Sequence, residues 1–249
     1  MKIIVRPLDQ IAALVADDVQ ALLASKPDAV LGMTTGTTPL TTGIFQELIC
    51  REAQGQLSFA STAFINPDEQ IGIGPDHEQS YYQYMKRHML DELRTQPKEW
   101  HIPIGTAADP IAECEAIEAA IARLGGVDWQ LLGIGINGHI CFIEPAPSLP
   151  AKCFVTPIAE VNRELYAKDY GSLADVPTHA ITYGWGTVLA ARELCLVACG
   201  QHKADIVARA LTGNVTPELP ATIVQIHPNA TIILDPEAAS KLDMELLRS

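Results

Sequence analysis

The strongest restriction on the fold of this chain comes from short apolar segments that alternate with segments of helical period. Residues 29–33, 63–65, 127–136 and 194–199 have the length and composition of buried strands. Between strands, apolar side chains recur every three or four positions, as they also do in the helix predicted over residues 11–23. Strands that alternate with helices in this way predict βαβ units and a mostly parallel sheet.

The boundaries of several predicted helices are marked by residues that start or stop a helix. Pro27 ends the first helix, and Ser80 is placed to cap the helix that directly follows it. Asp109 and Pro110 open a further helix, which Gly125 ends. These signals support the alternation of strands and helices along the chain.

The predicted fold class is α/β, a single-domain, Rossmann-like, doubly wound and mostly parallel sheet with helices on both faces. The remaining strands are predicted at residues 181–183 and 232–234. No repeat, low-complexity tract or long linker divides residues 1–249, so we predict one domain. Ligands of such sheets bind beyond the carboxyl ends of the strands, and we therefore expect the site among the loops that follow strands.

The charge of the chain argues against nucleic acid and membrane surfaces as partners. Its 249 residues include 17 Lys and Arg and 30 Asp and Glu, which gives a formal net charge of −13. A phosphate backbone needs a basic stripe, and the basic residues of this sequence are scattered. An anionic membrane would repel the chain for the same reason. A small anionic substrate stays compatible, because one cation and a few backbone amides suffice to bind it.

The sequence predicts a cytoplasmic protein without a metal site. The first residues turn polar too soon for a secretory signal, and no apolar run approaches the roughly 18 residues of a membrane helix. The six cysteines contain no CxxC pair, which favours reduced thiols inside a cell. The seven histidines show no HxxxH pair and no ligand spacing with cysteine, so no metal is expected.

One loop after a predicted strand has the composition of an anion cradle. It consists of Thr34, Thr35, Gly36, Thr37 and Thr38, and it leads into the start of a helix. Gly36 permits a tight turn, the helix start offers free N–H groups, and the hydroxyls add further donors. The loop is neither a P-loop nor a GxGxxG motif, so it fits either a phosphate site or an ordinary capped turn.

Two further segments offer groups for acid–base chemistry. Asp68 and Glu69 lie in the predicted loop after the second strand, where a carboxylate can act as a base or simply be solvated. The glycine-rich segment 133–145 carries His139 and, five residues later, Glu144. An imidazole titrates near neutral pH and moves protons in either direction, and a carboxylate can orient it. The alternative is a structural histidine after a buried strand.

Lys203 is a further candidate for binding an anion. It lies in the first turn of a predicted helix, where the helix dipole disfavours a cation. The energetic cost of this placement is small. Lys203 is therefore either a solvated lysine or a group that shares the helix start with a bound anion.

Five segments resemble motifs of the glucosamine-6-phosphate deaminase (isomerase) family and follow one another in the family's order. They are residues 31–39, 64–72, 77–82, 133–145 and 200–204. The segment 133–145 resembles the ring-opening motif and is the specific one of the five. The resemblance implies conversion of glucosamine 6-phosphate to fructose 6-phosphate and ammonia, a step of amino sugar metabolism and N-acetylglucosamine catabolism. It also implies that no cofactor or metal is needed.

The resemblance implies a role for each matching residue. Asp68 would remove the C2 proton and deliver it toward C1, and His139 would move the proton that opens the pyranose ring. Glu144 would tune and orient His139, and Asn137 would hold the ring-opening position beside it. The groups implied to bind the phosphate are residues 35–38 and Lys203.

The sequence departs from the family pattern at positions expected near the substrate. Asn137 stands where many members have Asp, and a neutral amide would orient rather than ionise. Gln70 replaces a usual Tyr and Ile143 a usual Asn, and we interpret both as positions that can retune recognition at C4 of the sugar. The arginine that some members use for phosphate has no clear match, and the candidates are Arg163 and Lys168.

The segment 148–171 is polar and is predicted to be irregular, and we interpret it as a lid over the site. This interpretation rests on its position and on the resemblance. The family includes monomers and hexamers, so the sequence is compatible with a monomer and with a homo-oligomer.

Three other functions stay open at this point. One is a galactosamine-6-phosphate deaminase/isomerase. Another is a 6-phosphogluconolactonase, whose motif also contains Gly-His but usually continues as Ala-Ser-x-Phe-Pro, unlike residues 140–145. A lactonase would leave Asp68 and Glu69 unexplained. The last is a non-catalytic sugar-phosphate-sensing domain, which normally carries a helix-turn-helix for which this chain has no basic patch.

Overall fold

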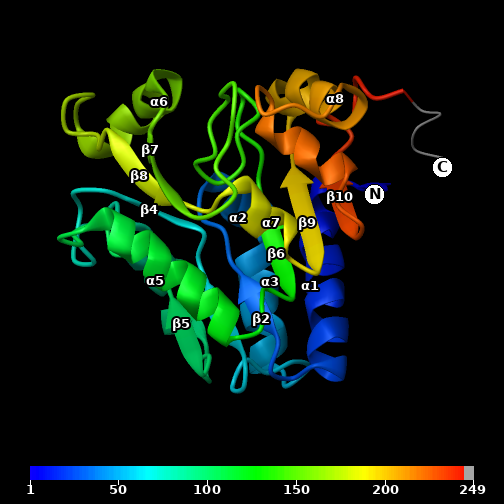
Figure 1. The fold of residues 1–249 in the computed structure, drawn as a ribbon. Helices are drawn as coiled ribbons and strands as arrows, with labels where there is room; N and C mark the ends of the chain where they lie inside the picture. The colour runs from blue at the N-terminus through cyan, green and yellow to red at the C-terminus, as the bar shows by residue number, and fades with distance from the viewer. Residues whose placement is uncertain (244–249) are drawn as a thin grey trace.

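The computed structural model describes residues 1–243, and Figure 1 shows their arrangement. The strands are β1 (Lys2–Val5), β2 (Val30–Gly32), β3 (Ala63–Ile65), β4 (Asp68–Gln70), β5 (Glu99–His101), β6 (Trp129–Leu132), β7 (Phe154–Pro157), β8 (His179–Thr182), β9 (Glu193–Ala198) and β10 (Ala230–Leu234). The helices are α1 (Leu8–Ser25), α2 (Thr37–Thr41), α3 (Ile44–Ala53), α4 (Tyr81–His88), α5 (Pro110–Arg123), α6 (Glu160–Tyr170), α7 (Trp185–Leu189) and α8 (Ala204–Thr212). Short 3-10 helices are η1 (Leu90–Glu92), η2 (Gln201–Lys203) and η3 (Pro220–Gln225). The predicted domain 1–249 includes residues 244–249, which lie outside the described residues.

The main sheet has seven strands in the order β1-β10-β9-β6-β2-β3-β5. All neighbouring pairs run parallel. Along the chain, β2, β3 and β5 extend the sheet in one direction, and β6, β9 and β10 extend it in the other. The direction reverses between β2 and β6, which is the point at which doubly wound sheets bind their ligands.

Helices cover both faces of this sheet, because successive strand residues point to opposite sides. On β9, Cys195 and Val197 belong to the apolar core that contains residues of α1 and α3. Leu194 and Leu196 belong to the other core, which contains residues of α5 and α8. The predicted class, a Rossmann-like, doubly wound and mostly parallel α/β sheet, is confirmed (Figure 1).

The helix boundaries predicted from local signals are also confirmed. The Ser80 hydroxyl accepts a hydrogen bond from the Gln83 N–H at the start of α4, at 3.1 Å. The Asp109 carboxylate accepts from two N–H groups in the first turn of α5. Gly125 follows α5 with φ +84°, a left-handed conformation that glycine adopts at low cost.

A second, antiparallel sheet of three strands, β4-β8-β7, adds to the predicted architecture. The prediction of a loop at Asp68 and Glu69 is wrong, because both belong to β4, with Asp68 opposite Thr182 of β8. The polar sequence of β4 has no apolar alternation, so its extended conformation depends on its partners in the fold. Strand β8 therefore lies in this small sheet and not in the parallel one.

Two other predicted segments differ from the structure. The strand expected over residues 127–136 covers only Trp129–Leu132. It ends there because the glycine-rich segment turns back, and the Gly135 N–H donates to the His139 carbonyl at 2.9 Å. The segment 148–171 is not irregular, since it contains β7 and α6. Helix α6 exposes much of its surface, so its polar composition conceals its helical period.

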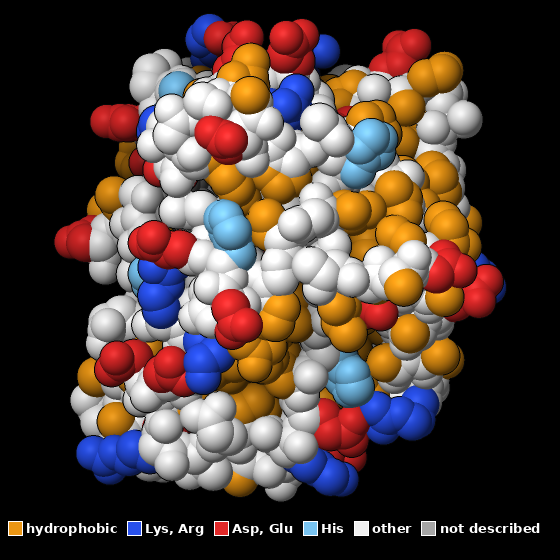
Figure 2. Space-filling view, turned by 90° about the vertical axis from the view of Figure 1, so that its left-hand side faces the viewer, with side chains coloured by type: hydrophobic (Ala, Val, Ile, Leu, Met, Phe, Trp, Pro, Cys, Tyr) orange, Lys and Arg blue, Asp and Glu red, His pale blue; other side chains and the backbone are white. Residues whose placement is uncertain are grey.

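The surface agrees with the scattered charge of the sequence. On the face shown in Figure 2, Lys and Arg side chains are interspersed with Asp and Glu. Within residues 1–243, no helix is long and apolar enough to cross a membrane.

Candidate active site

Four segments singled out in the sequence meet at one edge of the parallel sheet. The threonine loop follows β2, and Asp68 comes shortly after β3. The segment 133–145 follows β6, and Lys203 comes shortly after β9. These four strands are neighbours in the sheet, and parallel strands end at the same edge. The topology itself therefore brings the candidate residues together, at the place where such sheets bind ligands.

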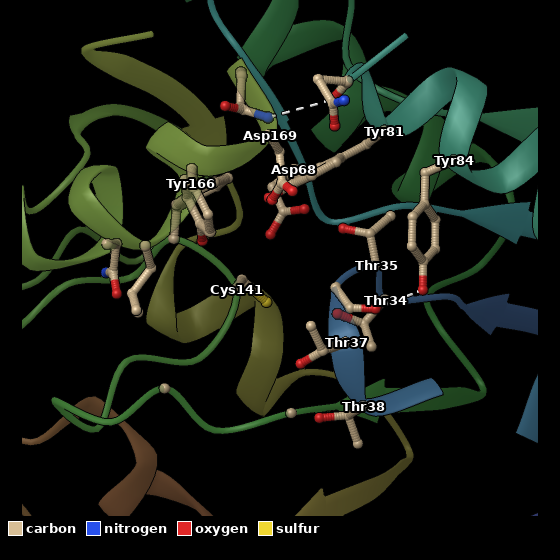
Figure 3. A pocket seen from close by; sticks show the side chains of 18 of the residues that line it. Thr34, Thr35, Thr37, Thr38, Asp68, Tyr81, Tyr84, Cys141, Tyr166 and Asp169 are labelled. Carbon is tan, nitrogen blue, oxygen red and sulfur yellow. Dashed lines mark hydrogen bonds between the residues drawn. The ribbon is translucent and has the colours of Figure 1, made fainter. Parts of the chain in front are cut away.

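These segments line a pocket of about 420 Å³, shown from close by in Figure 3. Pockets of this size bind small-molecule substrates. The predicted residues that line it are Thr34, Thr35, Gly36, Thr37, Thr38, Asp68, His139 and Lys203. Asn137 and Glu144 do not line the pocket and instead contact one another next to His139.

One end of the pocket is built for an anion. Gly36 has φ +96°, which lets the loop turn before α2 begins, and the Tyr84 hydroxyl donates to the Gly36 carbonyl at 2.6 Å. The Lys203 ammonium donates to the Ile134 carbonyl at 2.7 Å and lines the same pocket. Burial lowers the pKa of Lys203, which is the cost of keeping this cation in a site with little water. Four threonine hydroxyls and one ammonium are suited to bind a phosphate.

The two candidates for a second phosphate cation have different positions. The Arg163 guanidinium donates to the carbonyls of Leu173 and Val176, at 2.9 and 3.2 Å, and does not line the pocket. Lys168 does line it, together with Arg87 of α4, which the sequence reading missed. Arg163 therefore holds the turn after α6, and Lys168 is the better placed of the two.

Asp68 lies in the pocket with a buried carboxyl oxygen that no group within residues 1–243 contacts through a hydrogen bond. Its side chain is 3% exposed, and its buried Oδ1 has no hydrogen-bond partner among the described residues. Burial raises its pKa well above the usual value, and the neighbouring Glu69 raises that pKa further. Figure 3 shows Asp68 in the cavity between Tyr166 and the threonine loop. A carboxylate held in so dry a place is a stronger base than one in water.

Glu69 has a different task, although it adjoins Asp68. One of its oxygens accepts from the N–H groups of Gln70 and Tyr81, at 2.9 and 3.1 Å, and the other accepts from Tyr82 at 3.1 Å. Burial raises the pKa of Glu69 to about 7, and the three N–H groups act in the opposite direction. Glu69 thus joins β4 to the start of α4 and is turned away from the pocket chemistry.

His139 belongs to a chain of hydrogen bonds that ends on Glu144. The Nδ1 atom of His139 lies 2.7 Å from Oδ1 of Asn137, and Nδ2 of Asn137 donates to Glu144 Oε2 at 2.7 Å. Glu144 Oε2 is 3.7 Å from Nδ1, so the carboxylate acts on the ring directly through its charge as well as through Asn137. Burial lowers the pKa of His139, Glu144 acts to raise it, and Lys203 acts to lower it.

This chain determines which nitrogen of His139 carries the proton. A carboxylate only accepts hydrogen bonds, so Asn137 must turn its NH₂ group toward Glu144 and its oxygen toward His139. Because that oxygen also only accepts and makes the shorter contact, Nδ1 carries the proton in the neutral ring, and the Asn162 amide nitrogen at 3.2 Å is then a second donor and not a hydrogen-bond partner of Nδ1. The Nε2 lone pair is then free, with no hydrogen-bond partner within residues 1–243, and can take a proton from a substrate.

Helix α6 supplies pocket residues that the sequence reading missed. Asn162, Tyr166 and Tyr170 are spaced four positions apart, and all three line the pocket. Tyr166 packs with Tyr81 against the apolar cluster that contains Phe142, and the Tyr170 hydroxyl donates to Gln70 Oε1 at 3.0 Å. The spacing places them on one face of the helix, and it becomes a signal only once residues 160–170 are known to be helical.

The structure separates the two positions assigned to C4 recognition. Gln70 lines the pocket, as that interpretation requires. Ile143 is fully buried in the apolar core and does not line the pocket, so its assignment to C4 recognition is wrong. An apolar residue next to Glu144 serves packing, because the turn that carries it faces the core.

The family model of glucosamine-6-phosphate isomerases/6-phosphogluconolactonase matches residues 7–233 of the chain. The chain belongs to this family. The glucosamine-6-phosphate deaminase of Arthrobacter sp. (strain FB24) is 41% identical over 243 residues, which cover 97% of this chain and 93% of the relative. That of Thermoanaerobacter pseudethanolicus (strain ATCC 33223 / 39E) is 37% identical over 249 residues, which cover 100% of this chain and 98% of the relative. The resemblance drawn from the motifs is confirmed.

Solved structures of family members give the same result. A monomeric glucosamine-6-phosphate deaminase matches with a TM-score of 0.91 and 35% identity, covering 97% of this chain and 100% of the other. A 6-phosphogluconolactonase from Leishmania guyanensis matches with a TM-score of 0.72 and 18% identity, covering 97% of this chain and 98% of the other. The second match shows a shared fold only.

Proposed function

We propose that this chain is a glucosamine-6-phosphate deaminase that converts its substrate to fructose 6-phosphate and ammonia in amino sugar metabolism. The observation that carries the proposal is one pocket that holds three features. They are the Asp68 carboxyl group, whose buried Oδ1 has no hydrogen-bond partner within residues 1–243, the His139 imidazole with its free Nε2 lone pair, and a loop of threonines with Lys203 that suits an anion. The curated relatives of that name, at 37 to 44% identity, support it. Every group named comes from one chain, so the proposal is compatible with a monomer and with a homo-oligomer.

The first chemical task is to open the pyranose ring. The free Nε2 of His139 takes the proton of the C1 hydroxyl, the C1–O5 bond breaks, and the proton is returned to O5 to leave an open-chain aldehyde. Asn137 keeps Nδ1 as the donor in the neutral ring, and Glu144 favours the imidazolium that forms in between. An imidazole suits this step because it accepts and releases a proton near neutral pH.

The second task is to move a proton from C2 to C1. Asp68 takes the C2 proton, one proton of the substrate ammonium moves to O1 so that an enolamine forms, and Asp68 then delivers the C2 proton to C1. The imine left at C2 is then hydrolysed to a ketone and ammonia. Burial makes Asp68 basic enough for a carbon acid and keeps its proton away from water. The substrate's own ammonium supplies a positive charge beside this carboxylate, whose Oδ1 has no hydrogen-bond partner among the described residues.

Binding at the phosphate end orients both reacting carbons. Residues 34–38 and Lys203 hold the phosphate, and that remote binding energy positions the sugar against Asp68 and His139. We also propose that residues 148–171 act as a lid, since α6 extends over the pocket from this segment. We place the enzyme in the cytoplasm, where sugar phosphates are metabolised.

The test is a substrate comparison with the purified wild-type protein. Ammonia release is followed with glucosamine 6-phosphate and with galactosamine 6-phosphate, and lactone hydrolysis with 6-phosphogluconolactone. The proposal predicts ammonia from the first substrate at a rate well above that from its C4 epimer, and no lactonase activity. Ammonia only from the epimer would reassign the substrate. Binding of either amino-sugar phosphate without turnover would make the protein a sensor and overturn the proposal.

A further inference from the structure

Asn162 is the one side chain of α6 that reaches the hydrogen-bond chain of His139. It is 2% exposed, although α6 is otherwise a polar surface helix. Its Nδ2 donates to Glu144 Oε1 at 2.6 Å and lies 3.2 Å from His139 Nδ1. The rest of the chain, Asn137 and Glu144, comes from the segment after β6. Asn162 is therefore the contact through which a different element of the fold acts on the imidazole.

The two amides share the Glu144 carboxylate between them. Asn137 occupies Oε2 and Asn162 occupies Oε1, so neither oxygen is left to turn toward the ring. With both oxygens held, the carboxylate keeps its 3.7 Å distance from Nδ1, and Nδ1 keeps its short bond to Asn137. That bond is what leaves the Nε2 lone pair free.

We propose that Asn162 is a positioning residue for His139, and that docking of α6 over the pocket sets the orientation and proton-accepting state of the imidazole. The inference rests on the proposed function and adds to it a coupling between α6 and the ring-opening step. When α6 is away from the pocket, Glu144 loses one of its two amide partners and is free to rotate toward the ring. The histidine is then fully prepared only when the helix covers the substrate.

The charged and titratable groups around His139 determine how a substitution at Asn162 should change the pKa of the imidazole. Glu144 comes from the same segment as His139, Lys203 from η2, and Tyr166 from α6. Asn162→Leu keeps the size of the side chain and removes the amide that compensates Glu144. The carboxylate then acts more strongly on the ring, which favours the imidazolium. The acid limb of kcat/KM should move to higher pH, because a protonated Nε2 cannot take the substrate proton.

The experiment compares Asn162→Leu and Asn162→Asp with Glu164→Ala, a substitution on the exposed side of α6. We expect kcat for glucosamine 6-phosphate to fall roughly tenfold or more in both Asn162 variants, since acid–base catalysis contributes about 10² to 10⁴. KM should change little, and the acid limb should shift upward, further in Asn162→Asp because a second carboxylate faces Glu144. Glu164→Ala should keep the wild-type profile. An unshifted acid limb in both Asn162 variants would overturn the proposal, even if kcat fell, because lost packing alone would not move it.

A second measurement does not depend on turnover. Titration of the imidazole resonances by NMR, with His139 assigned by comparison with His139→Gln, should show a higher pKa for His139 in Asn162→Leu than in the wild type. If the wild type releases no ammonia, the proposed function fails, while this titration still decides the role of Asn162. An identical titration of His139 in the wild type and in Asn162→Leu would refute the coupling in either case.

Discussion

Gly135 gives the sharpest test of whether the His139 ring must stay where the structure places it. A Cβ atom at Gly135 would lie 2.2 Å from Cε1, 2.3 Å from Nδ1 and 2.6 Å from Nε2 of His139. Non-bonded carbon atoms need about 3.5 Å, so Gly135→Ala must displace the ring by about 1 Å or more. The backbone there does not have the positive φ that favours glycine, so the added methyl group meets the ring without straining the backbone.

The expected loss follows from the geometry of the hydrogen-bond chain. A ring displaced by that distance cannot keep the 2.7 Å contact between Nδ1 and Asn137 Oδ1. A misplacement of about 1 Å costs roughly 100-fold in rate, and we predict that loss in kcat for Gly135→Ala. KM should change much less, because the phosphate end of the pocket is untouched. Initial rates of ammonia release over a range of substrate concentrations measure both constants.

Gly133→Ala is the matched control, since it adds the same methyl group to the same segment. Its Cβ would meet Thr38 Oγ1 at 3.4 Å, which is an ordinary contact, and kcat should stay close to the wild-type value. A wild-type kcat in Gly135→Ala would show that the ring need not stay where the structure places it. An equal loss of kcat in Gly133→Ala and Gly135→Ala would also contradict this prediction, because the loss would then reflect a general disturbance of segment 133–145 and not displacement of the His139 ring.

Three further predictions concern the phosphate end, the buried carboxylates and α6. Lys203→Met should fold normally and raise KM about tenfold or more, because the phosphate loses a hydrogen bond from a charged group. A KM equal to the wild-type value would show that Lys203 does not bind the phosphate. The folded pKa of Glu69, about 7, lies above its unfolded value of 4.5, so its contribution to stability is present below that unfolded value and is lost as the pH rises through 7. Urea unfolding of the wild type and of Glu69→Gln at several pH values should therefore show that the free energy of unfolding of the wild type falls relative to that of the variant as the pH rises from acid to mildly alkaline. The fall should be up to about 3 kcal/mol. A difference between the two proteins that does not change with pH would contradict this. A substrate analogue should protect residues 148–171 from protease, and Tyr170→Phe, which removes the hydroxyl that contacts Gln70, should weaken that protection; equal cleavage with and without analogue would argue against a lid.

Much of the parallel sheet was predictable, because its strands and helices carry local signals. Strand β3 occupies the predicted residues 63–65, and Ser80 and Asp109 cap the helices they were expected to cap. Strand β4 was not predictable in this way. Asp68, Glu69 and Gln70 have no apolar period, and they form a strand because β8 offers hydrogen bonds to them.

Some residues of the candidate site were predictable from the sequence for the same reason, and others were not. Residues that come shortly after strands of the parallel sheet, such as Asp68 and His139, could be found because ligands of a doubly wound sheet bind beyond the carboxyl ends of its strands. Asn162 could not be found in the same way, because it lies on a helix in a segment that reads as polar and irregular. Ile143 was assigned to the substrate from sequence position alone, and it is a core residue because the turn before Glu144 faces inward.

The measurement that tests the account most directly is ammonia release from glucosamine 6-phosphate by the wild type and by Asp68→Asn. Asparagine fills the same buried space and cannot accept the C2 proton. We predict steady ammonia release by the wild type and its loss in the variant, with binding of the sugar phosphate retained as a rise in melting temperature. An Asp68→Asn variant that binds the substrate and still releases ammonia at the wild-type rate would contradict the account, because another group would then have to be the base.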